Sequence, residues 1–395
     1  MAKRKKYITI AASAAAIILI LIGLYLFIKN NRSYKPETEQ TLSVWYVNDD
    51  VMWNGFEAYC KDYNENDGEK LRIKVAPRAF ESAQQMQDAV ETGEEKPDIM
   101  ACDSSYAAYL KENGYLADMN ALFEEYPKSD LNADMLAEVT AGDSLLGLPV
   151  ASKTQVFIVN KAMFADTDAL KTFEQLCSCA NEYYSRNQKS FFTISSYSMF
   201  FRDALAQLGE KFDGVSPHDT QSENCKYVYK LLAQAAYDRG FTASGGKAVE
   251  MLANGEVAAA IVSSAELMQY ADKFEGKNFV FLSYPRLKDG KSVYTENVTC
   301  MTVFASNDER EKSAAEFLKR FVSTKNNQDF VDTSGYLPAI GTHETDGGKF
   351  YTALMSAVDD EAKAGAPADI TPDAQYSQNI KRFNEFLDTI MESLD

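Results

Sequence analysis

Side chains that could act as nucleophiles, bases or metal ligands are few and scattered in this 395-residue chain. His218 and His343 are the only histidines; each lies among loop-like residues, and they are far apart in the sequence. There is no HExxH zinc motif and no serine nucleophile elbow. The sequence therefore does not predict a histidine-based catalytic site.

Two short segments resemble ion-binding loops without completing them. Asp62 begins a pattern typical of a calcium loop, but Asp67 occupies the position of the required glycine and Ile73 that of the required glutamate. The segment 240–247 resembles a phosphate loop, but its spacing is wrong and Ala248 replaces the serine or threonine. We therefore expect no metal and no cofactor. Carboxylates are abundant and unmarked, so an extracellular hydrolase stays open as a minor alternative.

Six cysteines are an even number, which is compatible with disulfides in an outward-facing protein. Their spacing does not dictate any pairing, and free buried thiols are the alternative. The Cys177-Ser-Cys179 segment lacks CxxC spacing and has no nearby histidine. The six are Cys60, Cys102, Cys177, Cys179, Cys225 and Cys300.

The elements that must position any site alternate between strands and helices, which predicts mostly parallel sheets covered by helices. Expected strands lie at 42–47, 71–75, 98–101, 156–159, 257–262, 279–282 and 300–305. Expected helices lie at 52–64, 82–92, 106–113, 170–184, 225–239, 248–253, 306–322 and 380–394. The helix at 306–322 is predicted to open with a capping box formed by Ser306 and Glu309.

The N-terminal 28 residues predict a membrane anchor. A basic hexapeptide precedes 22 uncharged residues, 7–28, which as a helix would span roughly 33 Å, enough for the hydrocarbon core of a bilayer. The dense basic cluster places residues 1–6 in the cytoplasm and the rest outside. A cleaved signal peptide is the alternative, although the small residues lie early in the run.

Composition limits the function of the remaining chain. The net charge is −18, but seven of the 40 basic residues and no acidic ones fall within the first 35 positions. The rest of the chain is therefore strongly acidic, and a domain with this charge repels nucleic acid and anionic lipid surfaces. We expect a soluble, monomeric, two-lobed globular part, because the residues beyond 41 exceed one typical core.

Four ordered segments resemble the family 1 extracellular solute-binding proteins of ABC importers, the maltose-binding-protein-like group. They are LSVWYV at 42–47, the run from AVETGEEKPDI at 89–99 to YLKENGYLAD at 109–118, LGLP at 146–149 with VNK at 159–161, and MLANGEVAA at 251–259; the tail 316–338 also fits. The resemblance implies a two-lobed α/β fold of type II with a hinge and an interlobe cleft. It predicts lobe 1 from 42–150 plus about 295–338, lobe 2 from 151–294 plus about 339–395, and a linker at 29–41.

Some positions depart from the family pattern. Cys102 and Ala265 stand where sugar-binding members have tryptophans, and Ser105 and Lys153 stand where they have acidic residues. Those family contacts are therefore not carried over. A cation at Lys153 would favour an acidic or phosphorylated ligand.

Candidate ligand-binding residues are polar and aromatic side chains near strand ends that face the hinge, where open α/β sheets bind ligands. They are Trp45, Asp49, Asp50, Trp53, Ser104, Ser105, Tyr106, Ser152, Lys153, Gln155, Ser263, Ser264, Tyr284, Arg286, Asn297, Tyr336 and Tyr376. Each also has a structural interpretation, as a core, capping or solvated residue.

The resemblance implies a non-enzymatic protein that binds a polar solute, expected to be a carbohydrate, and presents it to ABC permease subunits in the membrane. The alternative is a membrane-tethered surface sensor or scaffold with a degenerate cleft, motivated by the missing aromatic platforms.

Overall fold

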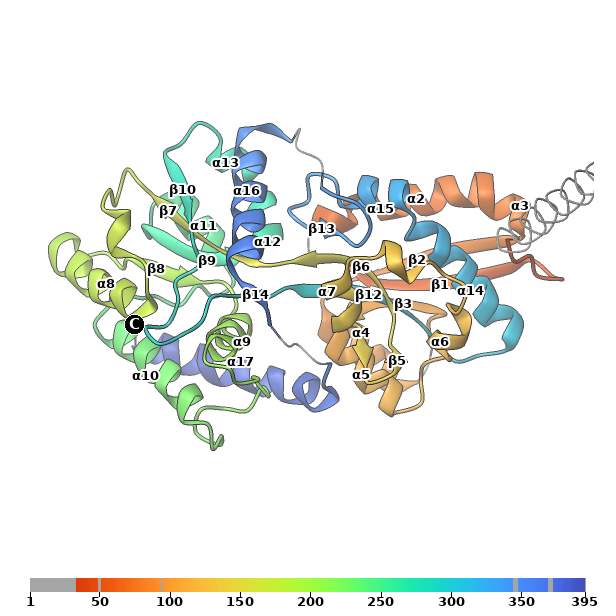
Figure 1. The fold of residues 1–395 in the computed structure, drawn as a ribbon, viewed down its shortest axis with the longest axis horizontal. Coiled ribbons are helices and arrows are strands. Elements are labelled where there is room, and N and C mark those ends of the chain that lie inside the picture. Colours follow the sequence, from red (N-terminus) through yellow and green to blue (C-terminus); the bar gives the residue numbers. More distant parts are fainter. Residues whose placement is uncertain (1–32, 49–50, 94, 344–346, 369–371, 395) are drawn as a thin grey trace, which may run out of the picture.

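The computed structural model describes residues 33–48, 51–93, 95–343, 347–368 and 372–394. The predicted membrane segment and the candidates Asp49 and Asp50 lie outside these residues. Among the helices of the described part, none is long and apolar enough to cross a membrane. The described chain forms two lobes, each built on its own sheet (Figure 1).

Lobe 1 contains a six-stranded sheet in the order β13-β6-β12-β3-β1-β2. Its strands are β1 (Gln40–Val47), β2 (Ile73–Phe80), β3 (Ile99–Asp103), β6 (Leu148–Lys153), β12 (Asn297–Val303) and β13 (Leu337–Pro338). Its helices are α2 (Phe56–Tyr63), α3 (Glu69–Leu71), α4 (Ala83–Thr92), α5 (Ser104–Glu112), α6 (Met119–Leu122), α7 (Ala133–Glu138), α14 (Asp308–Phe321) and α15 (Thr324–Val331). Shorter pieces are η1 (Val51–Gly55), η2 (Asn64–Gly68), η3 (Lys128–Asp130) and the hairpin of β4 (Thr140–Ala141) and β5 (Ser144–Leu145).

Lobe 2 contains a four-stranded sheet in the order β10-β7-β9-β8. Its strands are β7 (Gln155–Asn160), β8 (Phe192–Ile194), β9 (Ala259–Ser263) and β10 (Phe279–Leu282). Its helices are α8 (Phe173–Asn187), α9 (Tyr197–Gln207), α10 (Glu223–Tyr237), α11 (Ala248–Asn254), α12 (Ser264–Met268), α13 (Ala271–Phe274), α16 (Gly348–Ala364) and α17 (Ala374–Leu394). A short turn, η4 (Thr167–Ala169), and the pair β11 (Val293–Tyr294) with β14 (Ala366–Pro367) complete the set.

The prediction of mostly parallel sheets was wrong. β2, β1 and β3 are parallel, but β12 runs antiparallel to both β3 and β6, and β7 runs antiparallel to β9 and β10. The reason is that the chain passes between lobes along strands: β6 ends at Lys153 and β7 begins at Gln155, while β12 returns after β11. These crossing segments join the two lobes in Figure 1.

Strand alternation explains how both faces of each sheet are buried. In β7, Phe157 and Val159 enter one core of lobe 2, whereas Val156 and Ile158 enter the other. In β1, Val44 belongs to the main core of lobe 1, and its neighbour Trp45 faces a smaller core on the opposite side.

Helix starts follow from local capping. Ser82 accepts a hydrogen bond from the Gln85 amide at the start of α4, close to the predicted start. The predicted capping box at α14 was wrong by one residue: Asn307 is the N-cap, and its side chain accepts from the Arg310 amide. Asparagine is at least as good an N-cap as serine, so the more C-terminal of the two neighbours caps the helix.

Candidate functional site

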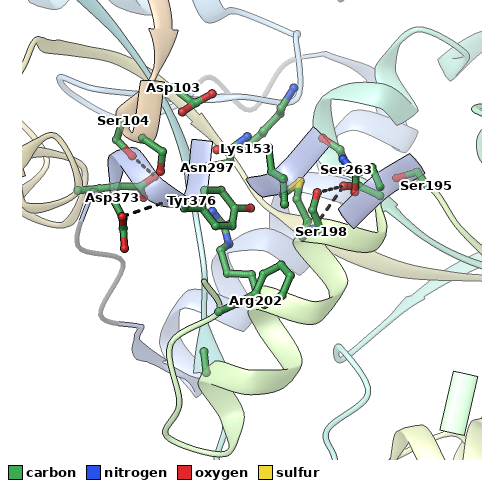
Figure 2. A pocket seen from close by; sticks show the side chains of 18 of the residues that line it. Asp103, Ser104, Lys153, Ser195, Ser198, Arg202, Ser263, Asn297, Asp373 and Tyr376 are labelled. Carbon is green, nitrogen blue, oxygen red and sulfur yellow. Dashed lines mark hydrogen bonds between the residues drawn. The ribbon is translucent and has the colours of Figure 1, made fainter. Parts of the chain in front are cut away.

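A cavity of about 430 Å³ lies between the lobes and is lined by residues of both. Lobe 1 contributes the start of α5 and the end of α7, the crossing strands contribute Lys153 and Asn297, and lobe 2 contributes α9, α12 and α17. Helix α17 also contacts α5, so it bridges the lobes beside the cavity. Figure 2 shows Tyr376 near the middle of the lining, with Lys153 and Asn297 on one side and Arg202 on the other.

Four helices begin at the cavity, because the chain turns from strand or loop into helix at this edge of each lobe. Their N-cap side chains line it: Asp103 of α5 accepts from the Tyr106 amide at 2.8 Å, and Ser196 of α9, Ser263 of α12 and Asp373 of α17 accept similar bonds. Helix N-termini carry partial positive charge. The carboxylates of Asp103 and Asp373 offset part of this charge, so the helix starts offer a solute both hydrogen-bond donors and acceptors.

Arg202 of α9 supplies a nearly buried cation, with its side chain 12% exposed. Its Nη2 donates to the carbonyl of Glu296 at 2.9 Å, and its Nε lies 3.8 Å from Asp203 Oδ1. Burial by itself lowers the pKa of an arginine, but the neighbouring carboxylates of Asp203, Glu138 and Asp103 outweigh burial and raise the pKa of Arg202. The guanidinium therefore stays charged and ties lobe 2 to the crossing segment.

The carboxylates around Arg202 come from both lobes. Glu138 is 6% exposed and accepts hydrogen bonds from the Val298 amide at 3.2 Å and from Ser104 Oγ at 3.4 Å. Burial raises the pKa of Glu138 to about 7, opposed by Arg202. Burial likewise raises the pKa of Asp203 to about 6, although Arg202 and a hydrogen bond from Thr295 oppose the rise.

Replacing Glu138 with glutamine is expected to weaken the pH dependence of stability. Because the folded protein binds the Glu138 proton more tightly than the unfolded chain does, its stabilising effect is complete below the usual pKa of 4.5 and is lost as pH rises through about 7. Wild type should lose about 2–3 kcal/mol from this group between pH 5 and pH 8. Glutamine keeps the oxygen that faces the Val298 amide but does not ionise.

Urea unfolding at the two pH values measures this difference. Asp103 and Glu296 also face Glu138 and remain in the variant, so part of the pH dependence should persist. Glu182→Gln, at an exposed residue of α8, is the matched control. Equal losses of stability in wild type and Glu138→Gln would contradict the assigned pKa.

An apolar wall faces these polar groups. Tyr376 and Phe212 meet edge to face, with ring centroids 5.9 Å apart, and Met199, Ala206 and Ile380 line the same cavity. Phe212 packs in turn on Phe383 of α17, with centroids 4.7 Å apart. The cavity therefore combines aromatic faces, hydroxyls, amides and charged groups, a lining suited to a solute with both an apolar face and hydrogen-bonding edges.

A second cavity of about 140 Å³ adjoins the first on the lobe 1 side and shares Asp103, Lys153 and Asn297 with it. Lys153 Nζ lies 5.3 Å from the centroid of the Tyr336 ring, over its face. Trp53 lines this cavity as well, and its ring contacts Tyr46. The crossing strand β6 thus ends between the two cavities.

The structure brings part of the predicted residue set together. The first cavity is lined by Ser104, Ser105, Lys153, Ser263, Asn297 and Tyr376, and the second by Trp53, Tyr106, Lys153, Asn297 and Tyr336.

The other predicted residues with described positions lie elsewhere. Trp45 is 1% exposed, because strand alternation turns it into the smaller core of lobe 1. Ser152 and Ser264 are fully buried, and Ser264 Oγ accepts from the Thr154 amide. Gln155 and Tyr284 line a separate void of about 10 Å³, and Arg286 pairs with the start of α8.

Several residues that line the first cavity were not predicted from the sequence. They are Asp103, Glu138, Ser195, Ser196, Ser198, Met199, Arg202, Ala206, Glu210, Lys211, Phe212, Glu266, Gln269, Asp373, Ile380 and Asn384. The sequence did contain a signal for Ser195 and Ser196. They lie between the mostly apolar run 191–194 and a helix, the same pattern that indicated Ser104 and Ser263 as candidates. Among the described residues, no cluster of three or more His, Cys, Asp or Glu side chains could hold a metal ion.

The chain is similar to known proteins both in sequence and in fold. The model of a family described as bacterial extracellular solute-binding protein matches residues 58–354. An ABC substrate-binding protein from Listeria monocytogenes in complex with cycloalternan superposes with a TM-score of 0.71 at 14% identity, over 90% of this chain and 94% of that one.

Two further solved structures have the same fold. The cyclic α-maltosyl-1,6-maltose binding protein from Arthrobacter globiformis gives a TM-score of 0.64 at 15% identity, over 90% of this chain and 99% of that one. UgpB from Mycobacterium tuberculosis, in complex with glycerophosphocholine, gives a TM-score of 0.67 at 14% identity, over 90% of this chain and 93% of that one. No curated protein sequence matches the chain.

Proposed function

Because the chain belongs to the bacterial extracellular solute-binding proteins, we propose that it is the substrate-binding component of an ABC importer and binds a carbohydrate between its lobes. The observation that carries the proposal is the cavity of about 430 Å³, to which both lobes and the crossing strands contribute. This volume lies within the usual range for small-molecule sites. The protein would act by binding and release, without catalysis or a cofactor.

The carbohydrate assignment is supported by the chemistry of the lining. A pyranose presents an apolar face, which Tyr376 and Phe212 could cover, and a rim of hydroxyls, which Ser105, Ser198 and Asn297 could bind. Two of the structural relatives have cyclic oligosaccharide ligands in their names, and the third binds a phosphodiester solute. Both solute types are rich in oxygen atoms, which suits the hydroxyl and amide donors of the cavity lining.

Binding would be coupled to lobe closure. A solute that contacts α5 of lobe 1 and α9 and α17 of lobe 2 has higher affinity for the closed arrangement, so it shifts the population towards that form. Permease subunits in the membrane could then recognise the closed form. The sensor alternative rested on a cleft without aromatic platforms; Tyr376 and Phe212 line the cavity, which favours solute binding.

Calorimetric titration of residues 33–395 tests the proposal. The panel contains linear and cyclic gluco-oligosaccharides, monosaccharides, polyols and glycerophosphocholine. We expect saturable binding of at least one carbohydrate at one site per chain. Heat from glycerophosphocholine alone would overturn the carbohydrate assignment but retain a solute-binding role. No heat across the panel would count against carbohydrate binding and favour the sensor alternative.

We further propose that residues 7–28 anchor the binding lobes to the outer face of the membrane. Support comes from their 22 uncharged residues and the preceding basic cluster. The described chain begins against α14 of lobe 1, where the Tyr34 amide donates to Glu316 Oε2 at 3.1 Å and Arg320 Nη2 donates to Ser33 Oγ at 2.8 Å. Lobe 1 would therefore be the tethered lobe. A tether would also raise the effective concentration of the protein near its permease.

The anchor predicts a clear fractionation result. The full chain should stay in the membrane fraction after an alkaline carbonate wash, whereas a chain exported without residues 1–32 should be released. Sequencing the mature N-terminus provides the control. A start near residue 30 would mean a cleaved signal peptide and a secreted binding protein.

A further inference from the structure

Two cysteines lie directly opposite each other in the sheet of lobe 1. Cys102 of β3 pairs with Cys300 of β12 in antiparallel register. Directly opposite residues in such a pair point to the same face, with α-carbons about 4.5–5.5 Å apart. Disulfides join α-carbons about 4.4–6.8 Å apart, so the backbone spacing suits a bond.

The side chains agree with the backbone register. Both thiols are free in the structure, and Cys300 is the group that contributes most to raising the pKa of Cys102, as expected for side chains that lie close together. Cys300 is fully buried, and Cys102 is partly buried beside the second cavity. The register therefore places the two side chains on the same face of the sheet, as a cross-strand bond requires.

The other cysteines have different surroundings. Cys60 lies in α2, Cys177 and Cys179 lie in α8, and Cys225 lies in α10. Cys177 and Cys179 are two positions apart on one helix, so their side chains point in different directions. These four therefore serve as internal controls for selectivity.

We propose that Cys102 and Cys300 form a cross-strand disulfide as the protein folds on the outer side of the membrane. The proposal relies on the extracytoplasmic location given above, where oxidising conditions allow disulfides to form and persist. The oxidant is an external disulfide. One cysteine thiolate attacks it, forms a mixed disulfide and releases one external thiol. The thiolate of the second cysteine then attacks the protein sulfur of the mixed disulfide, which forms the Cys102–Cys300 bond and releases the second external thiol. Two protein thiols are thus oxidised while one external disulfide is reduced to two thiols.

The bond must form before the strands are fully packed. In the folded protein, the adjacent thiol of Cys300 and burial both raise the pKa of Cys102 well above its usual value. Since the thiolate is the attacking species, exchange at the packed site is slow. Oxidation during folding, when both thiols are accessible, avoids this barrier, and the same burial then protects the finished bond from reduction.

The disulfide would fix the wall of the solute cavity. Asp103 follows Cys102 directly and caps α5, while Asn297 begins the strand that contains Cys300; both residues line the cavity. A bond between β3 and β12 holds these two positions in register. It also closes the long loop from Cys102 to Cys300, which restricts the unfolded chain and stabilises the folded one.

Refolding under controlled redox conditions tests the pairing. The full chain is unfolded in urea with a reductant and refolded in a mixture of reduced and oxidised glutathione, and free thiols are then blocked with N-ethylmaleimide. Mass spectrometry of the digest should find one linked peptide pair joining Cys102 to Cys300, with the other four cysteines alkylated. Six alkylated cysteines, or Cys102 linked to another residue, would overturn the proposal.

Thermal unfolding tests the structural role. The linked wild type should have a Tm a few degrees above that of the same protein refolded with excess dithiothreitol. The double variant with Cys102→Ser and Cys300→Ser should show equal Tm values under both conditions. If the linked wild type had the same Tm as the reduced wild type, that result would contradict the stabilising role. A linked protein that binds no carbohydrate would refute the proposed ligand only.

Discussion

Replacing Arg202 with methionine is expected to lower the free energy of unfolding by about 3 kcal/mol. The guanidinium is 12% exposed, donates to the Glu296 carbonyl and lies among the carboxylates of Asp203, Glu138 and Asp103. Removing one partner of a buried charge cluster leaves the others uncompensated, which costs far more than the loss of a surface ion pair. Methionine keeps most of the side-chain volume, so packing changes little.

Urea unfolding at pH 8, without ligand, measures this effect. At that pH, Glu138 and Asp203 are mostly ionised, so removing the cation leaves two charged carboxylates without their counter-charge. Arg202→Lys keeps the charge and should recover part of the stability. Arg186→Met removes an exposed arginine of α8 and should change the stability by less than about 0.5 kcal/mol. A loss at Arg202 no larger than that at Arg186 would contradict the buried cluster.

Replacing Tyr376 with alanine is expected to weaken solute binding by about 10- to 100-fold. The ring lies in the cavity wall, meets Phe212 edge to face and is carried by the first turns of α17, the helix that also contacts α5. An aromatic face buried against a ligand is typical of the few residues that dominate binding free energy. Its loss also exposes the apolar wall to water.

Calorimetry with the tightest carbohydrate of the panel measures the change. Tyr376→Phe should bind nearly as wild type if stacking dominates, and less well if the hydroxyl donates to the solute. Tyr237→Ala, at a tyrosine of α10 that is 70% exposed, is the matched control and should leave affinity unchanged. Unchanged affinity in Tyr376→Ala would remove this residue from the site.

Much of the fold could be predicted because apolar runs and helix caps are local signals. The run 42–47 lies within β1, and the run 279–282 is β10. Strand direction could not be predicted in the same way, because β12 is paired between β3 and β6 by contacts from distant parts of the chain. Only the assembled sheet shows that Cys102 and Cys300 are opposite each other.

The site was only partly predictable for the same reason. Ser104 and Ser263 mark the ends of apolar strands, a position that indicates an edge where ligands bind. Arg202 and Glu138 lie within and at the end of helices that carry no such marker, and they meet only when the two lobes are assembled. Likewise, Phe212 becomes part of an aromatic wall only because α17 brings Tyr376 to it.

The most direct test of interlobe solute binding is a crystal structure of residues 33–395 with the tightest carbohydrate of the panel. We expect electron density for the sugar in the cavity, with a ring against Tyr376 and polar contacts to the start of α5 in lobe 1 and to α9 in lobe 2. Density confined to the outer surface of one lobe, with the interlobe cavity filled only by water, would contradict it.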